Sequence, residues 1–348
     1  MRVSNFMFLN RTQKSFQDTF SKFYVSQEQL ATGLKINRPS DDVPGMAKAL
    51  DYKVQIANSN QYQRNIDDAQ SFLEFSDTAM SSVVENLQRM QELMVDGVNG
   101  SRGPVDREAI GKEISVIKDA LYALSVSRLR NRYVFSGQLT NLSSFVTSPV
   151  AVASTGGFYV YQGDTNVMEI NVNTSARVIE NITGSDAFAF SLNSTISMKI
   201  GTGNFARFTP SDTVPGLVTV NISASSDPGV AGFDQFSFSN YMDMARVIEE
   251  AFQTNNVDRM NAMLKPMELS IEKTVMVRAT IGARLNFMQQ IHNDNEGNTF
   301  NHMTYLSNVE DADMTKTTSD ISKSQVALQA LRQSSSQVMF QSLLDFLK

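Results

Sequence analysis

The chain has 348 residues, of which 41% are hydrophobic, and this is enough apolar material for two or three domains with a sizeable core. Thirty basic residues against 36 acidic ones give a net charge of −6, so the overall charge offers no attraction to nucleic acid or to an anionic membrane. The lack of cysteine excludes disulfides, thiolate nucleophiles and cysteine-ligated zinc.

The first segment predicts a long helix with one stripe for packing against a partner. Its stripe positions follow steps of three and four residues, which keeps one helix face turned in one direction. The stripe consists of Phe6, Leu9, Gln13, Phe16, Phe20, Phe23, Gln27, Leu30 and Leu34. The short apolar run at residues 6–9 does not suffice for a secretory signal, and no stretch reaches the length of a membrane-spanning helix.

A turn is predicted after this helix. Gly33 suits a backbone with positive φ at the helix end, and Pro39 prevents the helix from continuing. Asp41 and Asp42 suit the caps of the next helix. This elbow either sets the angle between the first helix and the rest of the chain or is a routine capped turn, and the sequence leaves both interpretations open.

Two further helices are expected to form an antiparallel hairpin. The first carries a core seam and ends near Gly97 and Gly100. The second begins at Pro104, where the missing N–H costs nothing, and carries apolar residues from Ile110 to Leu124. The core seam of the first helix consists of Ile66, Ala69, Leu73, Ser76, Met80, Val83, Leu87, Met90 and Met94.

The middle of the chain reads as a β-rich segment. Nine of the 18 glycines lie between residues 145 and 236, and short runs of β-branched and aromatic residues alternate with turn residues there. Strands are predicted at 158–161, 168–172, 176–182 and 217–223. The order of these strands in a sheet cannot be derived from the pattern.

Helical periodicity then returns. Helices are predicted at 241–252 and from Pro266 to a polar break at 293–298. A last helix, from Met314, repeats the heptad spacing of the first, with small serines that allow close approach. Its stripe consists of Thr317, Ile321, Ser324, Leu328, Leu331, Ser335, Val338 and Ser342.

The predicted fold class is α+β and predominantly α, as a nested rod of paired terminal coiled-coil helices and a long-helix bundle with an inserted β-rich domain. The expected domains are 1–44 with 300–348, 45–144 with 237–299, and 145–236. The two terminal stripes are expected to face each other, and their residues either contact neighbouring subunits or form the core of one chain. An ordinary intramolecular bundle remains the alternative.

Two sequence motifs carry a resemblance to a known family. Residues 31–42, ATGLKINRPSDD, resemble the N-terminal signature of the bacterial flagellin superfamily. Residues 278–286 resemble the segment that the same superfamily carries in its returning core helix, through Arg278, Gly282 and Asn286. Residues 132–137, with Arg132, Tyr133, Phe135 and Gly137, residues 310–313 and residues 342–347 look like the hook–filament junction proteins of that superfamily rather than like flagellins.

The resemblance implies a structural subunit outside the cell that forms a ring between a preceding hook-associated protein and the flagellin filament. It further implies export through the flagellar type III apparatus, without a cleaved signal peptide, and a cytosolic export chaperone that holds the C-terminal segment. Filament assembly and motility would depend on such a subunit. The alternative within the superfamily is flagellin itself.

Enzymatic readings find no support in the residues. The sequence GTGNFA at 201–206 imitates a dinucleotide fingerprint, but residues 207–210 cannot start the helix that such a site needs. His292 and His302 have neither helical nor loop spacing for a metal, and no hydrolase motif or complete calcium loop is present. We therefore expect no catalytic residue, cofactor or metal. A secreted enzyme or adhesin on a helical stalk would have to place its site in the β-rich segment.

Overall fold

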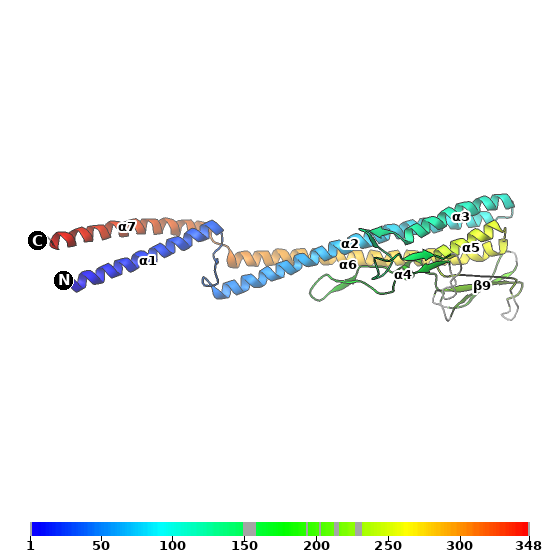
Figure 1. Cartoon of the computed structure of the whole chain (residues 1–348), viewed down its shortest axis with the longest axis horizontal. Helices are drawn as coiled ribbons and strands as arrows, with labels where there is room; N and C mark the ends of the chain where they lie inside the picture. The colour runs from blue at the N-terminus through cyan, green and yellow to red at the C-terminus, as the bar shows by residue number, and fades with distance from the viewer. Residues whose placement is uncertain are drawn as a thin grey trace. The chain divides into compact units, whose positions relative to one another are not determined.

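The computed structural model describes residues 2–148, 158–192, 194–201, 203–211, 216–226 and 232–346. It divides into two compact units, residues 1–61 with 294–348 and residues 62–293 (Figure 1). In the sequence, the second unit is thus inserted between the two segments that form the first unit. The predicted fold class, predominantly α with a β insertion, is confirmed.

The long helices extend further than the sequence pattern suggested, and one short helix was not predicted. In chain order they are α1 (Arg2–Thr32), α2 (Val43–Val98), α3 (Pro104–Ser125), α4 (Gly184–Phe188), α5 (Tyr241–Gln253), α6 (Val257–Glu310) and α7 (Met314–Phe346). The helix expected to start at Pro266 and stop at 293–298 in fact runs through both sites. Met263 and Met267 on either side of Pro266 are fully buried, so packing outweighs the lost backbone hydrogen bond. Asn295 and Thr299 are buried as well, which keeps the polar segment helical.

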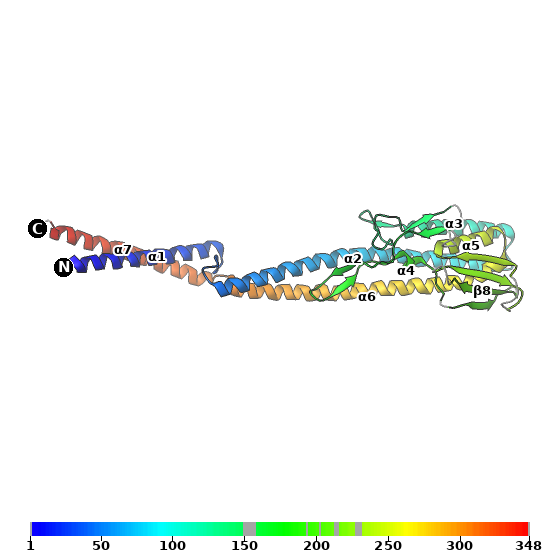
Figure 2. The same ribbon diagram turned by 60° about the horizontal axis from the view of Figure 1, so that its bottom comes forward.

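The strands form antiparallel pairs between near neighbours in sequence. Three two-stranded ribbons are β1–β2 (Arg128–Leu129 and Arg132–Tyr133), β3–β4 (Phe145–Thr147 and Tyr159–Tyr161) and β5–β6 (Glu169–Asn171 and Arg177–Ile179). The four-stranded sheet has the order β10-β9-β8-β7, from β7 (Ile196–Lys199), β8 (Phe205–Pro210), β9 (Val218–Ser223) and β10 (Asp234–Phe238) (Figure 2). The glycine-rich segment after β7 therefore leads into a strand, not a helix.

One hydrophobic core runs through the second unit. All nine predicted seam residues of α2, from Ile66 to Met94, have no exposed surface, so their assignment to the core is confirmed. The inward face of the sheet, with Phe208 paired to Val220, belongs to the same buried cluster. Aromatic rings such as Phe135 and Phe188, 5.1 Å apart at 88°, extend it under the ribbons. The helices and the β segment of this unit share a core, and the finer domain boundaries at 145 and 236 stay a prediction.

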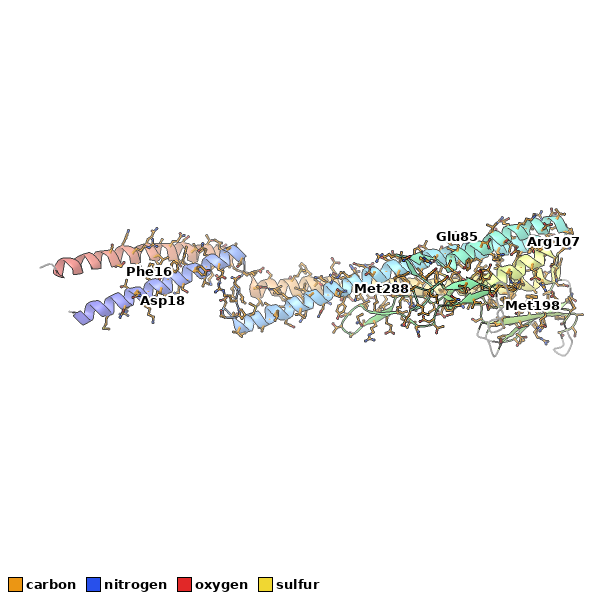
Figure 3. The ribbon with its side chains drawn as sticks, viewed as in Figure 1. Phe16, Asp18, Glu85, Arg107, Met198 and Met288 are labelled. Carbon is orange, nitrogen blue, oxygen red and sulfur yellow. The ribbon has the colours of Figure 1, made fainter. Side chains whose placement is uncertain are left out.

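Two buried charged groups fasten the ends of helices in this unit. The guanidinium of Arg107, marked in Figure 3, donates to the carbonyls of Gly97 and Asn99 at the end of α2, at 2.8 and 3.3 Å. A cation at a helix C-terminus also meets the negative end of the helix dipole. At the start of α5, the buried carboxylate of Asp243 accepts from the backbone N–H of Phe158 (2.8 Å) and from Asn240 Nδ2 (3.0 Å). Burial raises the pKa of Asp243, although the N–H of Phe158 and the hydroxyl of Ser239 oppose the shift.

A pH dependence follows from the buried tyrosine Tyr241. Its hydroxyl donates to the Ser270 carbonyl and accepts from Thr274, and burial raises its pKa from 10.0 to about 12. The folded protein keeps this proton where the unfolded chain has lost it, so stability is complete below pH 10 and falls as pH rises toward 12. We expect Tyr241 alone to contribute about 2–3 kcal/mol to this loss.

Urea unfolding at several pH values from 9 to 11.5 measures the effect. Tyr241→Phe removes the titrating hydroxyl, so its unfolding free energy should fall less steeply with pH than that of the parent protein. Burial also raises the pKa values of Tyr159 and Tyr161 to about 12, and a residual slope from these two groups is expected. Identical slopes for the two proteins would contradict the assignment.

Candidate assembly surface

The two ends of the chain pair with each other, as the matching stripes predicted. Helices α1 and α7 lie side by side along their length and run in opposite directions (Figures 1 and 2). Both chain ends therefore lie at the same end of this helix pair. The pair belongs to the first compact unit.

On α7, the less exposed positions repeat the predicted heptad. Leu328 is the most enclosed apolar residue of the described part of this helix, with 8% of its surface exposed, and Thr317 is buried too. The remaining half-buried stripe positions are Ile321, Ser324, Leu331 and Ser335. Val338 lies outside the residues whose side chains are described. The small Thr and Ser side chains let α1 approach closely.

On α1, the structure brings only part of the predicted stripe toward α7. Phe16 and Phe23 are half-buried, whereas Phe20 and Leu30 are 51% and 38% exposed. The other half-buried positions of the stripe are the small residues Thr12, Thr19 and Ser26. The predicted stripe residues Gln13, Phe20 and Gln27 are exposed instead. Small residues on α1 thus meet the small residues of α7, and the bulkier Phe20 is turned aside, with its ring stacked 6.3 Å from that of Phe16. The side chains of Phe6 and Leu9 lie outside the described residues.

The elbow joins both connections between the two helix pairs of this unit. Gly33 ends α1 with a φ of +75°, as the sequence predicted. Leu34, half-buried, forms a β-bridge with Asp311 of the other connection. The N–H of Lys35 donates to the carbonyl of Glu310 at 2.6 Å, and the N–H of Ala312 donates to that of Gly33 at 2.9 Å. These bonds couple the α1–α2 turn to the α6–α7 turn.

The two elbow aspartates cap backbone groups within this turn. The carboxylate of Asp41 accepts from the N–H groups of Asn37 (3.0 Å) and Arg38 (2.8 Å). Asp42 accepts from the N–H of Gly45 at 3.1 Å and so caps the start of α2. Pro39, which precedes both aspartates, is exposed. The elbow is therefore a capped turn, and its role in setting an angle stays a prediction.

Sequence reasoning gave no role in the elbow to four residues that hold it together. Ile36 is buried to 1% exposure, and a Cβ atom added to Gly45 would lie 2.6 Å from the Ile36 side chain. Glu310, 5% exposed, receives Lys53 Nζ at 2.6 Å. The run ATGLKIN contains Ile36 as an apolar residue inside an otherwise polar turn, and this was the only local signal.

The Lys53–Glu310 ion pair is expected to stabilise the closed elbow, and this can be tested. Glu310→Ala removes the acceptor for Lys53, and because Lys53 is half-exposed the loss should be about 1 kcal/mol. Opening of the elbow should then make the backbone after Lys35 accessible to trypsin about fivefold more often, whereas the bond after Arg38 resists trypsin because Pro39 follows it. Cleavage rates followed by mass spectrometry measure this, with Glu296→Ala at an exposed site of the same helix as the control. Equal rates in both variants would show that the pair does not hold the elbow.

The other motif residues lie in the second unit and act as its framework. Arg132 and Tyr133 form β2, and the carbonyl of the buried Phe135 accepts from the N–H of Gly184 at 2.7 Å. Gly137 has a φ of +70°, and a Cβ atom there would lie 1.9 Å from Asp164 Oδ1. The positive φ and the close approach of Asp164 explain why position 137 needs glycine.

The second motif lies on α6. Arg278 binds Asp77 of α2 through Nε at 3.0 Å and Nη2 at 3.1 Å, which ties the two long helices together. Gly282 has no other atom within 4 Å of an added Cβ, and Asn286 is exposed. Neither residue is explained by contacts within the described chain.

The described residues also bear on membrane insertion and on metal binding. Within the described ranges, no helix combines the length and the apolar character needed to cross a membrane. The same ranges hold no cluster of three or more histidine and acidic residues arranged to bind a metal. His292 lies 3.6 Å from Asp67, and the ring of His302 lies 6.1 Å from that of Tyr52, so the two histidines have separate surroundings.

Comparisons with known proteins agree with this architecture. Residues 3–140 match the family described as the bacterial flagellin N-terminal helical region. The flagellar hook-associated protein 3 of Salmonella typhimurium is 22% identical over 331 residues, which are 95% of this chain and 94% of that protein. The flagellin of Bacillus subtilis is 24% identical over 334 residues, 95% of this chain and 93% of its own. The chain spans only half the length of another relative, flagellin C of Vibrio anguillarum.

A solved structure shows the same fold. The flagellar junction protein FlgL from Legionella pneumophila superposes with a TM-score of 0.53 at 18% identity, over 76% of this chain and 99% of that one. The likeness concerns the fold of the part of this chain that the superposition covers. The first part of the chain is thus similar to the helical region of bacterial flagellins, and nearly the whole chain is similar to a flagellar hook-associated protein and to a flagellin.

Proposed function

We propose that this chain is a structural subunit of the bacterial flagellum and forms the junction ring between the hook and the flagellin filament. The observation that carries the proposal is the paired terminal helices, whose aromatic residues are only partly covered within one chain. Similarity to a flagellar hook-associated protein 3 and to the junction protein FlgL supports a role at the junction rather than elsewhere in the flagellum. Its partners would be further copies of this chain, the preceding hook-associated protein and flagellin.

A structural subunit of this kind has no catalytic cycle and needs no cofactor. It would leave the cell through the flagellar type III apparatus, with a cytosolic export chaperone on the C-terminal segment. The seam residues on α1 and α7 would order fully when neighbouring subunits cover them, because isolated helices gain most of their stability from packing. Each fully buried Leu or Phe then contributes roughly 1.5–3 kcal/mol.

Flagellin itself is the second candidate, favoured by the full-length similarity to the Bacillus subtilis flagellin. Deleting the gene separates the two. Hooks without filaments, with flagellin lost to the medium as monomer, are expected for a junction subunit, because flagellin is exported but has nothing to build on. Hooks with no flagellin in the medium would identify the chain as the filament protein. Normal filaments in the deletion strain would refute both functions.

A further inference from the structure

The described part of the helix pair presents two different flanks. One is an aromatic ridge, formed by Phe20 and Tyr24 of α1, with 51% and 55% of their surfaces exposed. The other is a groove of about 470 Å³ between α1 and α7. The groove is lined by Ser21, Lys22, Val25, Ser26, Asp320, Lys323 and Ser324.

Ridge and groove lie on opposite sides of α1. Successive residues of an α-helix are rotated by about 100°, so residues two apart point almost in opposite directions. Phe20 and Lys22 are such a pair, and Tyr24 and Ser26 are another. Ser21 is the groove residue nearest the ridge, and the remaining α1 residues of the groove lie farther around the helix. The two rings thus point away from the centre of their own groove and are placed to fill the groove of another molecule.

The groove suits the chemistry of the ridge. A cavity of about 150 Å³ holds one benzene ring, so 470 Å³ has room for two aromatic side chains. Val25, 43% exposed, supplies apolar surface, and the small Ser26 and Ser324 leave the space open. Lys22 and Lys323 lie on its lining, where an ammonium group can contact the face of an aromatic ring. The half-buried carboxylate of Asp320 pairs with Lys323 at 3.5 Å, and it can also accept from a tyrosine hydroxyl.

We infer that the aromatic ridge of one subunit docks in the groove of the next, so that the terminal helix pairs repeat head to tail. A contact between two different surfaces of one chain is heterologous, and such contacts close into rings or continue as helices instead of stopping at dimers. The inference rests on the proposed function, since it specifies which surfaces of the subunit meet in the assembly. It also explains why Phe20 is turned away from α7.

The test uses cysteine cross-linking, because the chain contains no cysteine of its own. Cells carry, as their sole copy of the gene, a variant with Tyr24→Cys on the ridge and Ser324→Cys in the groove. Their hook and filament fraction is treated with a short bismaleimide. We expect a ladder of dimers, trimers and larger species from the double variant. Each single variant should stay monomeric.

Two results would overturn the contact. A double variant that restores filaments but stays monomeric shows that ridge and groove are not adjacent. Dimers from either single variant show a two-fold contact between like surfaces instead. If Tyr24→Cys weakens docking itself, the pair Gln27→Cys with Lys323→Cys keeps both aromatic residues and is read in the same way. Failure of the proposed function is separate, because it appears as normal filaments in the strain without the gene.

Discussion

Replacing Leu328 by aspartate is expected to abolish filament formation. Leu328 is the most enclosed apolar residue of the described part of α7, at 8% exposure, and it faces the stripe of α1. A charge at this position has no described cation to pair with in the seam, and an unpaired buried charge costs several kcal/mol. The helix pair has only one packed stripe, so this cost should separate α1 from α7.

The matched control is Val326→Asp. Val326 lies two residues earlier on the outer side of the same helix and is 66% exposed, so the same change of side chain buries no charge there. Filaments counted by electron microscopy and swimming in soft agar measure assembly. Circular dichroism of the purified variants checks that the second unit stays folded. Filaments of normal number with Leu328→Asp would disprove the role of the stripe.

Replacing Gly137 by alanine should be the most destabilising small change in the second unit. Its φ of +70° costs an L-residue about 1–2 kcal/mol. The new Cβ would also lie 2.4 Å from the backbone oxygen of Asp164, and relieving such overlap costs about 1–3 kcal/mol more. For a unit of this size, each kcal/mol lowers Tm by about 2–4 °C, so we expect a fall of roughly 5–15 °C.

Two other glycines serve to separate the effect of the positive φ from the effect of the overlap with Asp164. Gly203 also has a positive φ, of +92°, but no atom lies within 4 Å of an added Cβ, so Gly203→Ala should cost only the backbone term. Gly282 has open space and lies within α6, and Gly282→Ala should raise stability by up to about 1 kcal/mol through helix propensity. Calorimetry on the three variants measures the order. Equal melting temperatures for Gly137→Ala and Gly203→Ala would exclude the clash with Asp164.

The local pattern of the sequence was sufficient for the long helices and their inner faces. The seam of α2 was predicted residue by residue, and the predicted heptad of α7 matches the less exposed positions from Thr317 to Ser335, because 3.6-residue periodicity depends on burial of one face and on little else. The end of α1 at Gly33 was also determined locally, since a positive φ at a helix end favours glycine. The short strands at 159–161, 169–171, 177–179 and 218–223 followed from β-branched runs between turn residues.

Only the tertiary structure decided how these parts meet. On α1, the sequence is compatible with two stripes that share Phe16 and Phe23: one contains Phe20 and the other contains Thr19. The structure has the stripe with Thr19, whose small side chain suits the small residues of α7. The continuity of α6 through Pro266 depends on methionines buried against other elements, and the elbow depends on backbone bonds from Lys35 and Ala312 to partners in distant segments. A short stretch of sequence contains only one of the two partners in such long-range contacts. The exposed ridge at Phe20 and the groove beside Ser324 therefore became visible only when both ends of the chain were placed together.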